Sequence, residues 1–417
     1  MDIWHIRGGQ RLEGISFVQG SKNASLPILA ASILIPLRCE LHNVPKLRDV
    51  DAALRILRHL GCRAEQWGNE VYIDSTTLSG CSIPHQLMEE MRSSVIFMGA
   101  LIARCGEARL SLPGGCQLGR RPIDLHLDAL HRMGAEIEED GAEISCRVSK
   151  LHGADILLRY PSVGATENAM LAACGGKGET VIHGAAREPE IEALQEFLRT
   201  IGAEVSGAGS ETIRIGGMRP QDHAVQRIIP DRIVASTIAC AAAATGGHVE
   251  LRGIDSKHFS TVLHFLNKAG CDIINNNRSV SIRSDGRLRA IGEVVTEPYP
   301  GFPTDAQPVL MAALLRAQGK TVIRETIFEN RFRQVPELRR LGADIRCSGR
   351  TAEIQGVDFL HGTALTATDL RGGAAMIVAG LAAEGETVIC DAGHVTRGYE
   401  SFDLCLRALG ADIYLEY

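Results

Sequence analysis

The strongest constraint on the fold of this chain is an internal repeat of about 70 residues. Six times along the 417 residues, an amphipathic helix-like segment ends in Gly-Ala or Gly-Cys, and a short alternating segment follows. A glycine directly after a helix is typical of a C-cap, where the backbone turns left-handed. The alternating residues predict a strand that returns as a second strand. The six glycines, spaced 73, 68, 68, 72 and 68 residues apart, are Gly61, Gly134, Gly202, Gly270, Gly342 and Gly410.

A second repeated segment interleaves with the first. It is an apolar, alanine-rich helix followed by glycine and a strand, and a helix that is apolar all round is typical of a buried one. Each unit is therefore predicted to run strand, buried helix, strand, outer helix, strand, strand. The buried helices are expected at residues 24–34, 93–105, 165–174, 233–245, 305–317 and 372–383.

The last unit is incomplete, because only one strand is expected between Gly410 and Tyr417. The missing strands are expected at residues 2–6 and 13–18, so that the two ends of the chain complete one unit together. The predicted fold class is α/β, with two domains of three units each. One domain is expected to hold residues 21–229, and the other residues 1–20 and 230–417. A single ring of six units is the alternative.

Charge and composition exclude several classes of protein. A formal net charge of −6, without a run of five or more basic residues, disfavours nucleic-acid binding. The longest apolar runs, at 24–36 and 233–245, are too short to span a bilayer, and the N-terminus lacks a signal-peptide pattern. Twelve cysteines without a CxxC pair argue against a zinc site and a secreted disulfide framework. We therefore expect a cytoplasmic protein without a nucleic-acid or membrane partner.

A glycine-rich segment at residues 112–122 carries a cysteine, Cys116, close to Arg120 and Arg121. Its glycines predict a solvent-facing loop, and Pro122 is typical of the first residue of a helix. Neighbouring positive charge and a helix N-terminus favour the thiolate form of cysteine. A reactive thiol above a bound anion is one interpretation. Taken alone, the segment is better explained as an ordinary turn with an incidental cysteine.

Basic residues recur before the predicted outer helices. Helix N-termini attract anions, so domains that face each other through these ends would form a multivalent anion site. Any one of these residues, taken alone, is better explained as a cap or a surface ion pair. Their recurrence in all six units favours the anion site. These residues are Lys46, Arg121, Arg187, Lys257, Arg331 and Arg397.

Long blocks of the sequence match one known family in order and spacing. They lie at residues 22–24, 112–116, 121–126, 161–168, 186–190, 229–233, 300–305, 325–332, 367–371 and 397–400. Over essentially the whole chain they resemble the UDP-N-acetylglucosamine 1-carboxyvinyltransferase family of enolpyruvyl transferases. The resemblance implies two inside-out α/β barrel-like domains, each a pseudo-threefold arrangement of the repeat.

The resemblance also implies a reaction. The enolpyruvyl group of phosphoenolpyruvate would move to the 3-hydroxyl of UDP-N-acetylglucosamine with release of phosphate, the first committed step of peptidoglycan precursor synthesis. The route would be addition followed by elimination through a tetrahedral intermediate. Cys116 would protonate the enol methylene, Asp305 would take the proton of the sugar hydroxyl, and Asp369 would assist proton movements. Lys22 completes the expected catalytic set.

The same resemblance implies a set of binding residues and no metal or organic cofactor. Arginine suits phosphate and carboxylate because its planar fork meets two oxygens at once. The implied phosphate ligands are Lys22, Arg121 and Arg397, and the implied carboxylate ligands are Arg331 and Arg371. The residues implied to orient the reacting groups or to hold the sugar nucleotide are Asn23, Arg92, Arg121, Pro122, Ile123, Asp124, Leu125, Ser162, Val163, Gly164 and Ile327.

Two alternative functions are compatible with parts of the sequence. The sequence does not determine the oligomeric state. The sister class, 5-enolpyruvylshikimate-3-phosphate synthase, shares the fold and the donor, but the Gly-Gly-Cys loop and the block at 161–168 argue against it. A catalytically idle sugar-nucleotide sensor is disfavoured because the expected functional positions are intact. Departures such as Val234 and Ser236 leave open a divergent second copy that acts on a modified sugar nucleotide.

Overall fold

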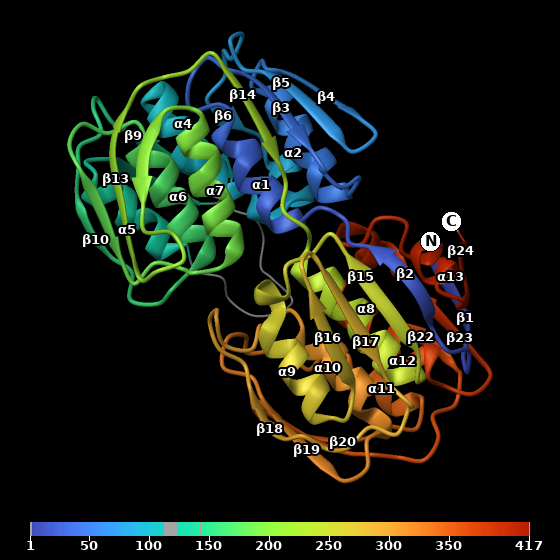
Figure 1. Cartoon of the computed structure of the whole chain (residues 1–417). Helices are drawn as coiled ribbons and strands as arrows, with labels where there is room; N and C mark the ends of the chain where they lie inside the picture. The colour runs from blue at the N-terminus through green and yellow to red at the C-terminus, as the bar shows by residue number, and fades with distance from the viewer. Residues whose placement is uncertain (1, 112–122, 142, 417) are drawn as a thin grey trace. The chain divides into compact units, whose positions relative to one another are not determined.

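The computed structural model describes residues 2–111, 123–141 and 143–416, which form two compact units. The central unit begins at Gly20 and ends at Ile229, and the terminal unit contains the chain up to Gln19 and from Pro230 onward. Each unit holds three four-stranded sheets within the described residues. In each unit the sheets lie outside and the inner helices lie between them (Figure 1).

The terminal unit contains strands from both ends of the chain. Its sheets have the orders β22-β23-β1-β24, β16-β17-β15-β2 and β18-β19-β21-β20. The strands are β1 (Ile3–Arg7), β2 (Glu13–Phe17), β15 (His248–Arg252), β16 (Asp272–Asn276), β17 (Ser279–Arg283), β18 (Gly292–Val295), β19 (Lys320–Arg324), β20 (Asp344–Ser348), β21 (Thr351–Gln355), β22 (Ala364–Thr366), β23 (Glu386–Cys390) and β24 (Asp412–Glu416).

The central unit repeats the same pattern, in which one parallel pair joins an antiparallel hairpin. Its sheets have the orders β14-β3-β5-β4, β6-β7-β9-β8 and β10-β11-β13-β12. The strands are β3 (Arg38–His42), β4 (Arg63–Trp67), β5 (Glu70–Asp74), β6 (Ser82–Ile83), β7 (Glu107–Ser111), β8 (Glu136–Asp140), β9 (Glu143–Arg147), β10 (Asp155–Leu157), β11 (Thr180–His183), β12 (Ala203–Ser206), β13 (Thr212–Met218) and β14 (His223–Arg227).

The inner helices are buried almost from end to end, as their apolar sequences predict. In the terminal unit the three inner helices all contact one another. Alanine and glycine on their surfaces permit this close approach, because small side chains bring helix axes together. The inner helices are α1 (Lys22–Ala31), α4 (Phe97–Cys105) after η1 (Arg92–Ile96), α6 (Val163–Ala173), α8 (Arg232–Thr245), α10 (Gln307–Ala313) before η3 (Leu314–Arg316), and α12 (Leu370–Leu381).

The outer helices are amphipathic and bury one face, which fits their mixed sequences. The repeated glycine follows them at six places, and its φ there lies between 94° and 109°. The predicted left-handed helix ends are therefore confirmed. The remaining helices are α2 (Arg48–His59), α3 (His85–Glu90), α5 (Asp124–Arg132), α7 (Pro189–Thr200), η2 (Ser256–Phe259), α9 (Ser260–Lys268), α11 (Val335–Arg340), η4 (Ala392–Arg397) and α13 (Phe402–Ala408).

The N-terminal strands complete two different sheets. β1 pairs with β24 and β23, so the strand expected at residues 2–6 does complete the last unit. Trp4 on β1 is 1% exposed and meets Phe402 with ring centroids 6.3 Å apart. The expectation for residues 13–18 is wrong in its partner. β2 instead lies parallel to β15 at the edge of another sheet, in the place that β22 takes beside β23.

The inner helix expected at residues 305–317 is shorter than predicted. α10 begins only at Gln307, and the N–H groups of Ala306 and Gln307 bond to the carbonyls of Pro303 and Thr304 in a turn. Asp305 therefore lies in a turn before the helix. In the described part of the chain, no helix is long and apolar enough to cross a membrane.

The left-handed glycines allow a direct test of the repeat. Gly342 has φ 97°, and a Cβ added there would meet nothing closer than 3.9 Å, so only backbone strain opposes Gly342→Ala. We expect this change to lower the free energy of unfolding by about 1–2 kcal/mol. Gly217→Ala is the matched control, because that site is equally open and its φ lies outside the left-handed region. Equal denaturant midpoints for the two variants would contradict the assignment.

Candidate active site

Three aspartates stand at the starts of the inner helices of the terminal unit, but they do different work. Asp231 caps α8 by accepting from the backbone N–H groups of Ile233 and Val234, at 2.8 and 3.1 Å. Asp369 caps α12 in the same way, with bonds of 2.9 and 3.1 Å from Arg371 and Gly372. α10 has no side-chain cap. The carboxylate of Asp305 therefore serves a purpose other than helix capping.

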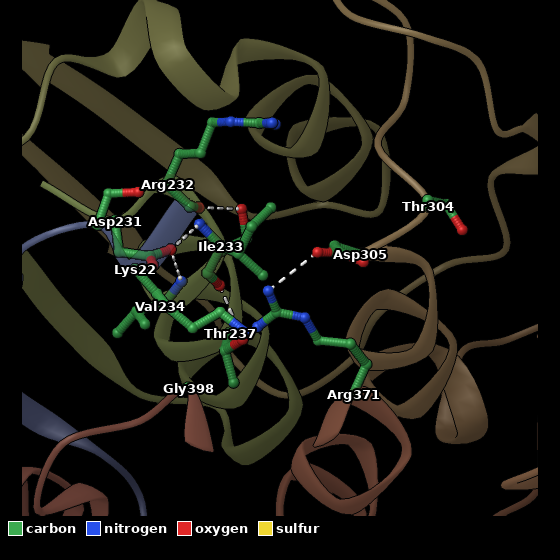
Figure 2. Close-up of polar contacts among 12 residues, drawn as sticks. Lys22, Asp231, Arg232, Ile233, Val234, Thr237, Thr304, Asp305, Arg371 and Gly398 are labelled. Atoms are coloured by element: carbon green, nitrogen blue, oxygen red, sulfur yellow. Dashed lines mark hydrogen bonds and ion pairs between the residues drawn. The ribbon is translucent and has the colours of Figure 1, made fainter. Parts of the chain in front are cut away.

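Two buried arginines hold the carboxylate of Asp305, one at each oxygen. Arg331 Nη2 lies 2.7 Å from Oδ1, and Arg371 Nη2 lies 2.9 Å from Oδ2. The arginine side chains are 2% and 6% exposed, whereas that of Asp305 is 31% exposed. A buried cation needs a counter-charge, so Asp305 stabilises both arginines. The two ion pairs in turn fix the orientation of its partly exposed carboxylate. Figure 2 shows the guanidinium of Arg371 pointing at Asp305.

Arg331 also fixes the backbone beside Asp305. Its Nε and Nη2 donate to the carbonyl of Thr304, at 3.1 and 3.0 Å. Its guanidinium lies 5.5 Å from the centroid of the Phe328 ring, within the range of a cation–π contact. Arg331 thus binds both the backbone of the turn and the carboxylate of Asp305, which lies in that turn.

Glu325 ties this turn to the segment that follows β19. It is 1% exposed, and its Oε2 accepts from the hydroxyl of Thr304 at 3.0 Å. Its Oε1 accepts from the backbone N–H groups of Ile327 and Phe328, at 2.8 and 3.0 Å. Ile327, expected at the sugar nucleotide, is therefore held within the same bonded network as Asp305.

Arg371 is the second residue of α12, and Asp369 sets the turn from which it projects. Burial alone would lower the pKa of the Arg371 guanidinium, but the negative charge of Asp305 reverses this effect and raises the pKa overall. Arg371 Nη1 also lies 3.5 Å from the hydroxyl of Tyr399. Arg397, an expected phosphate ligand, ends η4 two residues before Tyr399 and is half-buried.

The central unit carries the expected lysine in a buried ion pair. Lys22 begins α1, whose N-cap Ser21 accepts from the N–H of Ala24 at 3.2 Å. The Nζ of Lys22 lies 3.1 Å from Oδ2 of Asp49, and these side chains are 12% and 4% exposed. Asn23 is half-buried in the same first turn. Asp49 thus holds the ammonium group at the start of the helix.

The segments expected to hold the sugar nucleotide meet at the starts of α5 and α6. Ser162 caps α6 by accepting from Ala165 N–H at 3.3 Å, and Val163 and Gly164 form its first turn. A Cβ added to Gly164 would lie 3.1 Å from the His126 ring on α5. The two predicted segments are therefore neighbours, because Ile123, Asp124 and Leu125 directly precede His126.

Part of the expected site lies outside the described residues, namely Cys116, Arg121 and Pro122. Arg92 is the first residue of η1. Several residues that lie beside the expected ones carry no local signal in the sequence. The common cause is that each contact joins positions far apart in the chain, which a local pattern does not reveal. These residues are Asp49, Thr237, Thr304, Glu325 and Tyr399.

Comparison with known proteins assigns the chain and its fold to a family. The family model described as EPSP synthase (3-phosphoshikimate 1-carboxyvinyltransferase) matches residues 6–406. The solved structure of the enolpyruvyl transferase NikO from Streptomyces tendae is 26% identical, with a TM-score of 0.90 over 99% of this chain and 98% of that one. EPSP synthase from Acinetobacter baumannii, 20% identical over all of both chains, shares the fold with a TM-score of 0.79.

This chain therefore belongs to the EPSP synthase family of enolpyruvyl transferases. Two curated relatives share its full length. UDP-N-acetylglucosamine 1-carboxyvinyltransferase 2 of Caldanaerobacter subterraneus is 48% identical over 99% of both chains. UDP-N-acetylglucosamine 1-carboxyvinyltransferase of Geotalea uraniireducens is 45% identical over 99% of both chains. The predicted resemblance and fold class are thus confirmed.

His126 provides a pH test of the packing under this site. It is 7% exposed, and its Nδ1 accepts from the amide of Asn168 at 2.8 Å, an orientation set by Gly99 N–H donating to the Asn168 oxygen at 2.6 Å. Burial lowers the pKa of His126 from 6.5 to about 4.

Between pH 7 and pH 5, His126 therefore becomes protonated in the unfolded chain but stays mostly neutral in the folded chain. The depressed pKa contributes stability above about pH 6.5, and this stability is lost as the pH falls towards 4. When the pH is lowered from 7 to 5, we expect the free energy of unfolding of the native protein to fall by about 2 kcal/mol more than that of the His126→Gln variant. Urea unfolding at both pH values measures the difference, and identical pH dependence in the two proteins would refute it.

Proposed function

We propose that this chain transfers the enolpyruvyl group of phosphoenolpyruvate to the 3-hydroxyl of UDP-N-acetylglucosamine and releases phosphate. This would be the first committed step of peptidoglycan precursor synthesis, carried out in the cytoplasm. The observation that carries the proposal is full-length identity of 45–48% to relatives named for this reaction. The arrangement of Asp305 gives independent support, because its side chain is 31% exposed and held in place by two arginines, as suits a general base that must meet a substrate.

In the proposed mechanism, Asp305 takes the proton of the sugar hydroxyl while the hydroxyl oxygen bonds to C2 of phosphoenolpyruvate. Arg331 and Arg371 pair with the carboxylate and orient it, and their remaining N–H groups suit the carboxylate of the donor. Cys116 delivers a proton to the methylene carbon. Phosphate then leaves from C2 as the methyl carbon loses a proton, which re-forms the carbon–carbon double bond and gives the enol ether of the sugar.

The anionic groups of the substrates call for cations. Lys22, Arg121 and Arg397 are proposed to bind the phosphate of the donor, with Asn23 and Arg92 orienting the reacting groups. Asp369 is proposed to assist proton movement, although its carboxylate also accepts from the Thr368 hydroxyl at 3.2 Å besides capping α12. The segments at Ile123–Leu125 and Ser162–Gly164 are proposed to hold the uridine diphosphate, together with residues 121 and 122.

Phosphate release with two acceptors tests the proposed function. The full chain and phosphoenolpyruvate are incubated with UDP-N-acetylglucosamine or with shikimate 3-phosphate, and inorganic phosphate is measured. We expect release with the sugar nucleotide and none above background with the shikimate. Release with the shikimate alone would assign the chain to the sister activity, and release with neither would support an idle sensor.

The proposed acid, Cys116, predicts selective alkylation by a small epoxide phosphonate. Resemblance to fosfomycin-sensitive enzymes points the same way. Burial raises the pKa of several other thiols, so they stay protonated near neutral pH and react slowly. The pKa is raised to about 12 in Cys39, Cys146 and Cys174, and to about 11 in Cys62 and Cys271.

We expect peptide mass mapping after epoxide treatment to find the label on Cys116. Cys116→Ser should lose most activity, because a hydroxyl is too weak an acid near neutral pH. Cys116→Asp should retain activity, resist the epoxide and have a more acidic pH optimum, because a carboxyl titrates lower than a thiol. Label spread over several cysteines, or an unimpaired serine variant, would exclude the thiol as the acid.

A further inference from the structure

We propose that Tyr399, supported by Thr237, is a positioning residue that aims the guanidinium of Arg371 at the carboxylate of Asp305. The proposal rests on the proposed function, because it takes Asp305 as the base and Arg371 as a ligand of the donor. Neither Tyr399 nor Thr237 belongs to the residues that the sequence pattern assigned to the site.

The donor and acceptor roles in the hydrogen bonds around Tyr399 support this positioning role. The hydroxyl of Thr237 donates to the carbonyl of Ile233 at 2.8 Å, a bond that Figure 2 marks within α8. Thr237 and Tyr399 oxygens lie 2.9 Å apart. Because the single threonine proton is already committed, Tyr399 must donate to Thr237. The phenol oxygen then presents its lone pairs to Arg371 Nη1, at 3.5 Å.

Burial restricts Tyr399 to an indirect role. Tyr399 is 1% exposed and Thr237 is fully buried, and the Tyr399 hydroxyl faces Thr237 and Arg371, so both residues are assigned a role that acts through Arg371. The Tyr399 ring packs against Phe402 with centroids 4.7 Å apart, and the guanidinium of Arg371 lies 5.9 Å from the Tyr399 centroid. A phenylalanine would fill the same space and keep the ring contacts. Only the hydroxyl distinguishes a positioning residue from a packing residue here.

The two ends of one guanidinium group explain why this hydroxyl matters. Arg371 Nη2 donates to Asp305 and Nη1 faces Tyr399, so the two partners set the plane of the group. An arginine side chain has several rotatable bonds, and its reach is defined only when both ends are held. Removal of the phenol oxygen releases one end and lets the group turn away from the donor and from Asp305.

Steady-state kinetics of Tyr399→Phe, Thr237→Val and Thr237→Ser in the full chain test the proposal. For Tyr399→Phe we expect kcat/KM for phosphoenolpyruvate to fall about 10- to 100-fold, the loss of one hydrogen bond to a charged group. The KM for UDP-N-acetylglucosamine should change less than about twofold. Thr237→Val should show the same selective loss to a smaller extent, and Thr237→Ser, which keeps the hydroxyl, should restore activity.

Ser236→Ala is the matched control. Ser236 is a buried hydroxyl on the same helix that donates to the Arg232 carbonyl at 2.7 Å, so its removal perturbs α8 without touching Tyr399. This variant should behave as the native protein. Loss of the same size in Ser236→Ala, or proportional loss for both substrates in Tyr399→Phe, would mean a merely structural role and overturn the proposal.

Asp305→Asn separates failure of this inference from failure of the proposed function. Its turnover should fall by about 10²–10⁴ if the carboxylate is a general base. Adding Tyr399→Phe to it should then cause little further loss, because both changes act through one contact. If Asp305→Asn turns over slowly but Tyr399→Phe behaves as the native protein, the positioning role is rejected and the proposed function stands. Normal turnover in Asp305→Asn would remove Asp305 as the base, and with it the ground for this inference.

Discussion

The terminal unit depends on one shared carboxylate. Two buried guanidinium groups cannot lie side by side without a counter-charge, and Asp305 supplies it to both Arg331 and Arg371. Asp305 precedes α10, Arg371 lies in the first turn of α12, and Thr237 on α8 contacts Tyr399. The three inner helices therefore meet around one polar network as well as through apolar packing. Removal of the carboxylate would leave two buried cations, which is why its position is so firmly held.

The repeat explains how such a network arises in an otherwise regular fold. Equivalent aspartates begin the three inner helices, and two of them perform the ordinary task of an N-cap. At the third position the turn is tightened by Arg331 on the Thr304 carbonyl, α10 starts later, and the carboxylate points elsewhere. The same residue type thus caps a helix in two repeats, whereas in the third repeat it pairs with two buried arginines.

The sequence predicts the regular parts of this protein well, because they depend on local patterns. Left-handed glycines, buried alanine-rich helices and the pairing of β1 with the last unit all follow from period and composition. The partner of β2 does not, because a sheet strand gives no local indication of which edge it joins. The contact between Tyr399 and Thr237 could not be predicted either, because 162 positions separate the two residues in the sequence. The roles of Cys116, Arg121 and Pro122 stay predictions, as these residues lie outside the described part of the chain.

The placement of β1 and β2 in the terminal unit affects the order in which the molecule assembles. β1 and β2 leave the ribosome well before their partners β15, β23 and β24. The central unit begins at Gly20 and ends at Ile229, so its strands and helices are made before β15, β23 and β24. During that interval Trp4 and Ile6, both fully packed in the finished protein, stay in water on an unpaired strand. An unpaired strand with exposed apolar side chains is prone to aggregation until its partner strands are made.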